Sequence, residues 1–215
     1  MSDTEEKKAK DRILEAAIGL FAQKGYSATG LREIVKAADV SVAMVNYHFG
    51  TKQALLEEII QTFFSQIYVI AQKCLVGSDS AEQRVRKYFD EIIGFYSTNL
   101  EQLQIVFHEL PREIPGLVDL KASLASRLVD LYTSHILPAL PPETSKNIRT
   151  EIVGPAMMGM MTFHFLMRPV VERVFGIEFN TEFYHGYADH LADLFFYGVL
   201  GHSTNTQPAN ERNSK

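Results

Sequence analysis

Histidine and glutamate are the residues of this 215-residue chain best suited to catalysis, but their spacing does not favour it. His108 and Glu109 begin like the zinc-binding pattern HExxH, yet Arg112 stands where the second histidine is needed. His185 and His190 are five residues apart, so they do not share one face of a helix. The sequence also lacks a glycine-rich phosphate loop and a nucleophile elbow. We therefore expect no enzyme, no catalytic residue, no metal site and no cofactor.

A different chemistry is indicated by Asn46, Tyr47 and His48, which follow one another in a single short predicted helix. That helix begins after Ser41, a good N-cap, and Gly50 ends it. A helix that only packs would hide apolar side chains and surround them with lysine and glutamate. The hydrogen-bonding groups on this one suit contact with another molecule.

The elements that must position these residues are all predicted to be helices. Strand signals are almost absent, whereas apolar residues recur at intervals of three and four. An all-α fold is expected, with three short N-terminal helices packed on the start of a long fourth one. The first is expected at about 5–24, and the second is a two-turn helix whose inner face runs from Leu31 to Ala38. The third follows Ser41 and runs to about His48, and the fourth follows Thr51, which can cap it, and runs to about Lys73. The later helices are expected at about 81–98, 100–110, 117–138, 145–168 and 181–201. Prolines mark several of the gaps, among them Pro169 at the end of the 145–168 helix.

Two short helices joined by a tight turn are the plan of a helix-turn-helix, whose second helix enters the DNA major groove. Their spacing of four predicts that Val45 and Phe49 face inward. The outer face then carries Val42, Ala43, Asn46 and Tyr47.

Net charge at first argues against DNA binding, since the whole chain carries −5. The acidity belongs to the larger C-terminal part. Residues 1–52 have eight basic and seven acidic side chains, and residues 53–215 have 13 and 19. We predict a DNA-binding domain at 1–52, a regulatory and dimerisation domain at 53–202, and a disordered tail at 203–215.

The segments ILEAAIGLFAQKGYSATGLREIVKAADVS and VNYHFGTKQALLEEI resemble the DNA-binding domain of the tetracycline-repressor (TetR) family of bacterial transcription regulators. The resemblance covers residues 10 to 60. It rests on the apolar positions, the Gly-Tyr pair, the Ile-Val pair and the Tyr-His-Phe-x-x-Lys block. The remaining residues match the family only in length, in helix count and in two long C-terminal helices.

The resemblance implies a set of DNA-binding residues. Arg32 matches a position that reaches a base edge or a phosphate, and its guanidinium suits a bidentate contact with guanine. Lys52 matches a residue that binds a phosphate at the start of a helix. Thr29 and Ser41 could add hydrogen bonds to phosphate besides capping helices. The full set is Thr29, Arg32, Ser41, Val42, Ala43, Met44, Asn46, Tyr47, His48 and Lys52.

Two residues depart from the family pattern. Met44 stands where small or hydroxyl residues are common, so it could contact a thymine methyl or the sugar backbone. Asp39 replaces the usual turn glycine; aspartate tolerates left-handed backbone angles but adds repulsion near phosphates. Less specific roles compete for three of the predicted contacts. Tyr47 could be a half-buried structural aromatic, His48 could cap or pack, and Lys52 could be an ordinary solvated lysine.

For the C-terminal half, the resemblance implies a homodimer formed by the last two helices through a two-fold interface, and a pocket for a small effector. Abundant methionine and phenylalanine suit a hydrophobic or aromatic effector, although they suit a plain core equally. The alternative is a DNA-binding regulator controlled by protein partners instead of a small ligand. The candidate pocket residues are Phe89, Ile93, Tyr96, Phe107, His108, Leu128, Tyr132, Met161 and His164.

The expected compartment is the cytoplasm. Cys74 is the one cysteine, so no disulfide can form within the chain, and the charged N-terminus does not look like a signal peptide. The longest uncharged run, Ile152 to Met167, is shorter than the ~20 residues of a membrane helix and favours a buried helix.

Overall fold

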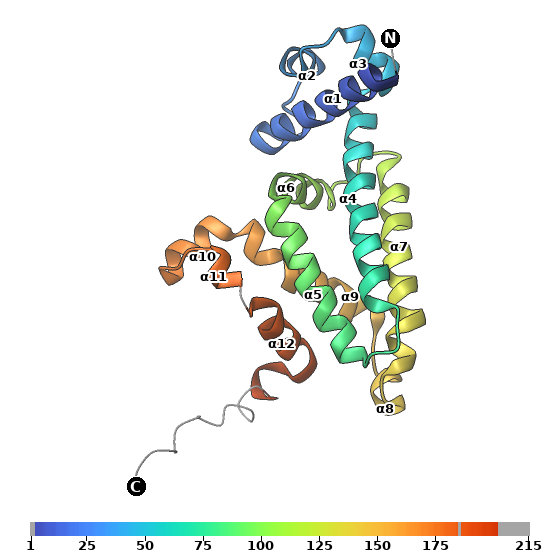
Figure 1. Cartoon of the computed structure of the whole chain (residues 1–215), viewed down its shortest axis with the longest axis vertical. Coiled ribbons are helices and arrows are strands. Elements are labelled where there is room, and N and C mark those ends of the chain that lie inside the picture. The colour runs from blue at the N-terminus through green and yellow to red at the C-terminus, as the bar shows by residue number, and fades with distance from the viewer. Residues whose placement is uncertain (1–2, 185, 202–215) are drawn as a thin grey trace.

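The computed structural model of the chain describes residues 3–184 and 186–201, and within these every regular element is a helix. The all-α fold predicted from the sequence is therefore confirmed (Figure 1). The predicted tail at 203–215 and His185 lie outside the described residues. The helices are α1 (Asp3–Lys24), α2 (Leu31–Ala38), α3 (Val42–His48), α4 (Lys52–Leu75), α5 (Ala81–Thr98), α6 (Leu100–Glu109), α7 (Leu117–His135), η1 (Leu137–Ala139), α8 (Pro142–Ser145), α9 (Thr150–Leu166), α10 (Arg168–Phe175), α11 (Thr181–Tyr184) and α12 (Tyr187–Gly201).

Helices α1 to α3 form a small domain at one end of the molecule (Figure 1). Its core consists of the apolar stripes that the sequence predicts, with Ile13, Ile34 and Val45 completely buried. The caps are also as expected. The Ser41 hydroxyl accepts a hydrogen bond from the Met44 amide at 3.2 Å, and a threonine side chain caps the start of α4 in the same way.

The turn between α2 and α3 depends on Asp39, which takes left-handed backbone angles with φ of 50° and ψ of 55°. Few residues other than glycine adopt these angles at low cost, and aspartate is one of them. The expectation that the turn survives the replacement of glycine is confirmed. The backbone N–H of Asp39 closes α2 by donating to the Lys36 carbonyl oxygen.

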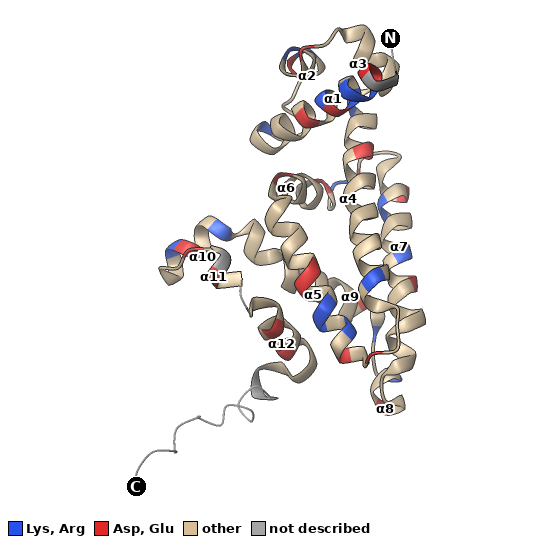
Figure 2. Cartoon of the chain, viewed as in Figure 1, with Lys and Arg blue, Asp and Glu red and all other residues tan. Residues whose placement is uncertain are grey.

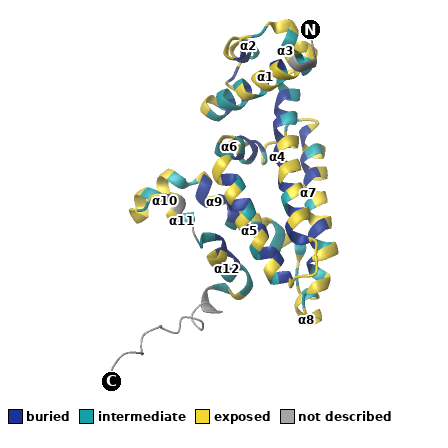
Figure 3. Ribbon diagram, viewed as in Figure 1, coloured by how far each residue is buried: buried dark blue, intermediate teal, exposed yellow. Residues whose placement is uncertain are grey.

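Helix α4 connects the small domain to the larger one and forms the spine of both (Figure 1). It packs against α5 and α7, and the buried residues run along its whole length (Figure 3). Among the described helices, α4 has the length and composition to span a bilayer, and 44% of its most apolar window is buried within the fold. A core helix passes the same test of length and composition, and the packing of α4 on both neighbours is that of a core helix.

The C-terminal third differs from the prediction in its helix ends. Pro155 lies inside α9 without ending it. Pro169, predicted to end a helix, instead lies in the first turn of α10, where a missing N–H costs nothing. The predicted 181–201 helix is two helices, α11 and α12, and Gly198 interrupts the second with non-helical angles. The 117–138 helix ends at His135 and continues as the short 3-10 helix η1.

Candidate nucleic-acid interface

Helix α3 presents one face to the core and the opposite face to solvent. Val45 is fully buried and Phe49 half-buried, as their spacing predicts. The four residues predicted on the outer face are all exposed: Val42, Ala43, Asn46 and Tyr47. Met44 lies at the edge, half-buried. The helix itself has no charged side chain, whereas α1 and α2 carry charges of both signs (Figure 2). The outer face therefore offers hydrogen-bonding and apolar groups, which are what base edges require.

Tyr47 and His48 differ in how they are placed. The side chain of Tyr47 is 73% exposed, which does not fit the half-buried structural role that the sequence left open. His48 is half-buried, and its ring lies between those of Tyr47 and Phe49, with centroids 5.0 and 6.2 Å away. The geometry of His48 thus agrees with the packing alternative. Its predicted contact with DNA remains a prediction.

Arg32 and Ser41 lie on the solvent side of the small domain. Arg32 is exposed in the first turn of α2, on an element that leads into the turn before α3. Ser41 is exposed as well, and its hydroxyl caps α3, which leaves the hydroxyl hydrogen available to a phosphate oxygen. Both positions are compatible with the DNA contacts predicted for them.

Lys52 is placed differently from either alternative considered from the sequence. Its ammonium donates to the carbonyl oxygens of Tyr26 and Thr29, both at 2.8 Å, and lies 4.4 Å from the centroid of the Tyr26 ring. Two of its three N–H groups are therefore used inside the protein. Lys52 connects the turn after α1 to the start of α4, and a phosphate contact would use the remaining N–H.

The phosphate contact predicted for Thr29 stays a prediction, and in this structure the side chain of Thr29 is 1% exposed. Its hydroxyl donates to the Gly25 carbonyl oxygen at 2.9 Å and is 3.3 Å from that of Leu20. Thr29 thus stabilises the turn from inside. Sequence reasoning also missed Tyr26, whose ring and carbonyl both receive Lys52. The Gly-Tyr pair singles out Tyr26 in the sequence, but it gives no sign of the contact with Lys52, which lies 26 residues further along the chain.

Comparison with known proteins finds that the N-terminal domain is similar to those of bacterial transcriptional regulators. Residues 13–59 match the family described as bacterial regulatory proteins, tetR family. YttP of Bacillus subtilis (strain 168), named a probable HTH-type transcriptional regulator, is 35% identical over 104 residues, which are 47% of this chain and 50% of YttP. The IcaR negative transcriptional regulator of the biofilm operon icaADBC, from Staphylococcus aureus (strain Newman), is 26% identical over 128 residues, 57% of this chain and 69% of IcaR. The N-terminal domain of this chain is thus similar to the DNA-binding domains of the TetR family.

Solved TetR-family structures share the fold along most of the chain. The regulator PfmR from Thermus thermophilus superposes with a TM-score of 0.70 at 22% identity, covering 87% of this chain and 98% of PfmR. A tetR-family protein from Rhodococcus RHA1 gives 0.67 at 22% identity, covering 91% and 98%. The likeness in sequence is more limited, since the match with YttP spans half of that protein.

We predict that Lys52→Met destabilises this N-terminal domain. The substitution keeps the length of the side chain but leaves two carbonyl oxygens without their charged donor, which costs about 1–3 kcal/mol of the free energy of unfolding. Urea denaturation measures the loss, and Lys36→Met, at an exposed position of α2, serves as the control. If the remaining N–H also binds phosphate, the slope of log affinity for DNA against log salt decreases by about one unit. If Lys52→Met is as stable as the wild-type protein, the two hydrogen bonds contribute little to stability.

The residues predicted to line an effector pocket are mostly parts of the core of the larger domain. Phe107 and Leu128 are half-buried, His108 is exposed, and six are buried: Phe89, Ile93, Tyr96, Tyr132, Met161 and His164. Tyr96 shows how tightly they pack, because its ring stacks on Phe63 and meets the edge of Phe165, with both centroids 5.9 Å away. The structure brings α5 and α9 together at these residues but places His108 elsewhere, on the side of α6 that faces the end of α1. The effector role of the set stays a prediction of the family resemblance.

His164 is the polar member of this set. It is 8% exposed and surrounded by aromatic rings, and its Nδ1 lies 2.9 Å from the hydroxyl of Tyr187 on α12. Burial lowers the pKa of His164 to about 4. The imidazole is consequently neutral at physiological pH and suits a neutral or apolar neighbour.

The low pKa of His164 predicts a loss of stability in mild acid. The unfolded chain takes up a proton near the ordinary value of 6.5, whereas the folded protein takes it up near 4. The contribution is fully present above pH 6.5 and falls as the pH decreases toward 4, by roughly 2 kcal/mol at pH 5. Urea denaturation at pH 7.5 and pH 5 measures it, with His164→Gln as the neutral control. An equal pH dependence in wild type and His164→Gln would contradict the assignment.

Proposed function

We propose that the chain is a cytoplasmic transcriptional repressor that binds a pseudo-palindromic operator as a homodimer and responds to a small hydrophobic or aromatic effector. The observation that carries the proposal is the exposed outer face of α3, where Asn46 and the 73% exposed Tyr47 are presented on a capped helix inside a fixed helix-turn-helix. Negative regulation is supported by the similarity to IcaR, a negative transcriptional regulator. The proposal includes no catalytic activity.

A two-fold dimer is supported by the surface of α9. Buried residues such as Met161 and Phe165 face the core, but the opposite side carries apolar residues in contact with solvent. These residues recur at helical spacing along one stripe: Ile152, Pro155, Ala156, Gly159, Phe163 and Leu166. Phe163 is 62% exposed and Ile152 54% exposed. A contiguous apolar stripe of this kind is typical of an interface, and in the proposed dimer a second copy of the chain covers it.

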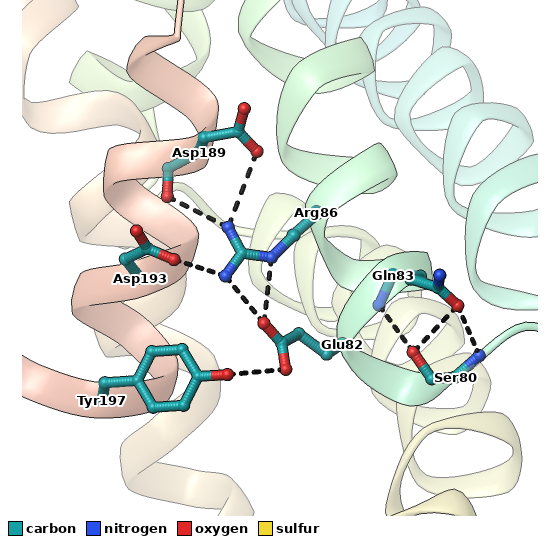
Figure 4. A network of polar contacts seen from close by, with 7 residues as sticks. All are labelled: Ser80, Glu82, Gln83, Arg86, Asp189, Asp193 and Tyr197. Carbon is teal, nitrogen blue, oxygen red and sulfur yellow. Dashed lines mark hydrogen bonds and ion pairs between the residues drawn. The ribbon is translucent and has the colours of Figure 1, made fainter. Parts of the chain in front are cut away.

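Helix α12 would form the second half of the interface, and a charged network attaches it to α5 (Figure 4). Arg86 of α5 donates to Glu82 from Nε and Nη2 at 3.0 and 2.7 Å, and Nη2 also pairs with Asp193 of α12. The Tyr197 hydroxyl donates to Glu82 at 2.8 Å. Hydrogen bonds from Arg86 and Tyr197 lower the pKa of Glu82, so its carboxylate is ionised at neutral pH. It fixes the position of α12, whose outer side carries Leu194 at 39% exposure.

In such a dimer the two copies of α3 address successive major grooves about 34 Å apart. Helix α4 carries α3 at one end and packs in the regulatory core along the rest of its length. An effector that changes the tilt of α4 would therefore change the separation of the two α3 helices and the affinity for the operator.

We predict that Asn46→Ala and Tyr47→Ala each weaken operator binding about ten-fold or more, since a well-placed base contact contributes about 1–3 kcal/mol. Both side chains are exposed, so the melting temperature should stay within a degree or two of wild type. Fluorescence anisotropy on an operator obtained by in vitro selection of genomic fragments gives the affinity. Val69→Ala, at an exposed position of α4, is the control. If both variants bind the operator as tightly as wild type does, α3 is not the helix that contacts the bases.

We predict that Phe163→Glu converts the dimer to a monomer. Two glutamates brought together in an apolar interface would each lose hydration without gaining a partner. Analytical ultracentrifugation measures the mass, and Val118→Glu, at an exposed position of α7, should remain dimeric. A monomeric wild-type protein, or a Phe163→Glu dimer as tight as wild type, would rule out this interface.

A further inference from the structure

A cavity of about 310 Å³ lies between the DNA-binding domain and the regulatory domain. One wall is the end of α1 with the turn behind it, residues 21–28, and the other is α6 with the segment that follows it. Helix α6 lies next to α1 in the fold (Figure 1). None of the buried core residues predicted to line an effector pocket belongs to this cavity; of that set, the exposed His108 alone contributes to its lining.

The cavity contains a buried carboxylate that is only half satisfied. The side chain of Glu109, the last residue of α6, is 1% exposed. Its Oε1 lies 3.0 Å from Nδ1 of His108. In the described part of the chain no hydrogen-bond donor reaches its Oε2, which has a long ion pair with Nε of Arg112 at 3.7 Å. Burying a carboxylate oxygen without a donor costs free energy, so this position favours a ligand that brings one.

Of the cations around the cavity, Lys24 is engaged elsewhere, whereas Arg112 forms an ion pair with Glu109. Lys24 forms an ion pair with Glu33 at 2.5 Å. The Arg112 side chain is 44% exposed, and its Nη1 donates to the Ser27 hydroxyl across the boundary between the domains at 3.2 Å. A ligand donor to Oε2 of Glu109 would therefore replace the 3.7 Å ion pair with Arg112, and the exposure of the Arg112 side chain permits the shift that this requires.

Two carboxylates act electrostatically on the wall of the cavity. Burial raises the pKa of Tyr26, and the charges of Glu109 and Glu57 raise it further. Both carboxylates thus act on the same region. The rest of the wall is apolar or aromatic, with Phe21 and Ile105 nearly fully buried beside the Tyr26 ring. The Tyr26 ring already lies 4.4 Å from one ammonium, that of Lys52, and aromatic rings next to a carboxylate are a favourable environment for an ammonium group.

We propose that this cavity binds a small organic cation, a primary ammonium on a compact apolar or aromatic group, whose N–H donates to Oε2 of Glu109. The volume lies at the lower end of the range for ligand pockets, which limits the ligand to a small molecule. Because the walls come from both domains, a bound cation favours one relative position of the DNA-binding domain over others. This inference rests on the proposed effector response and adds to it a class of ligand and a second binding site, between the two domains. Binding of the cation itself requires neither DNA nor a dimer.

The test is isothermal titration calorimetry of the full chain, without DNA and at constant ionic strength, with ethylammonium, butylammonium and benzylammonium as probes. Benzyl alcohol, of similar shape to benzylammonium but uncharged, is the ligand control. We expect saturable binding of at least one ammonium by wild type, at least ten-fold weaker binding by Glu109→Gln, and none of benzyl alcohol. Glu113→Gln removes an exposed carboxylate from the same segment and should bind as wild type does. No binding of any ammonium, or equal binding by Glu109→Gln, overturns the proposal.

A second variant keeps the test decisive if Glu109→Gln does not fold. Gln104 lines the cavity from an exposed position on α6, and Gln104→Trp would place a large side chain in the cavity without replacing a buried core residue. We expect this variant to lose ammonium binding while retaining the wild-type melting temperature. Full binding by Gln104→Trp would place the ammonium elsewhere and overturn the site. Since the titration contains no DNA, failure of this proposal and failure of operator binding are separate results.

Discussion

The ammonium of Lys52 forms the interaction on which the arrangement of the DNA-binding domain depends. Lys52 is the first residue of α4, and its ammonium donates to two carbonyl oxygens of the turn after α1. A positive charge at a helix N-terminus is unfavourable, because it meets the positive end of the helix dipole. The two charge-assisted hydrogen bonds and the Tyr26 ring offset that cost. Since α4 also forms the spine of the larger domain, this contact, together with the packing of α1 on α6, holds α1 and the helix-turn-helix relative to the rest of the molecule.

Features with local causes were predictable from the sequence. Ser41 and Thr51 are caps because their hydroxyls accept from amides three residues away, and Asp39 takes angles that few side chains tolerate. Both effects act within one turn, so residue type and position are enough to predict them. Pro169 misled the prediction because the same missing N–H that ends a helix is harmless in a first turn. The sequence alone does not tell which of the two applies.

Features that depend on distant contacts were not predictable. Thr29 and Lys52 have the polar groups of phosphate-binding residues, but their partners are backbone carbonyls that the fold brings to them. The same limit applies to the regulatory domain, where residue types cannot separate a pocket wall from a packed core. The cavity beside Glu109 is an example, since the segments that meet there at Ser27 and Arg112 are 85 residues apart.

The uncovered stripe of α9 has a consequence for how much of the protein is needed in the cell. A lone subunit leaves Phe163 and Ile152 in water, and in the proposed dimer their burial adds to the stability of the folded chain by mass action. Newly made subunits at low abundance would be more open to proteolysis than those that have met a second copy. The number of assembled pairs would also rise more steeply than the rate of synthesis, giving a threshold in expression below which the operator stays empty.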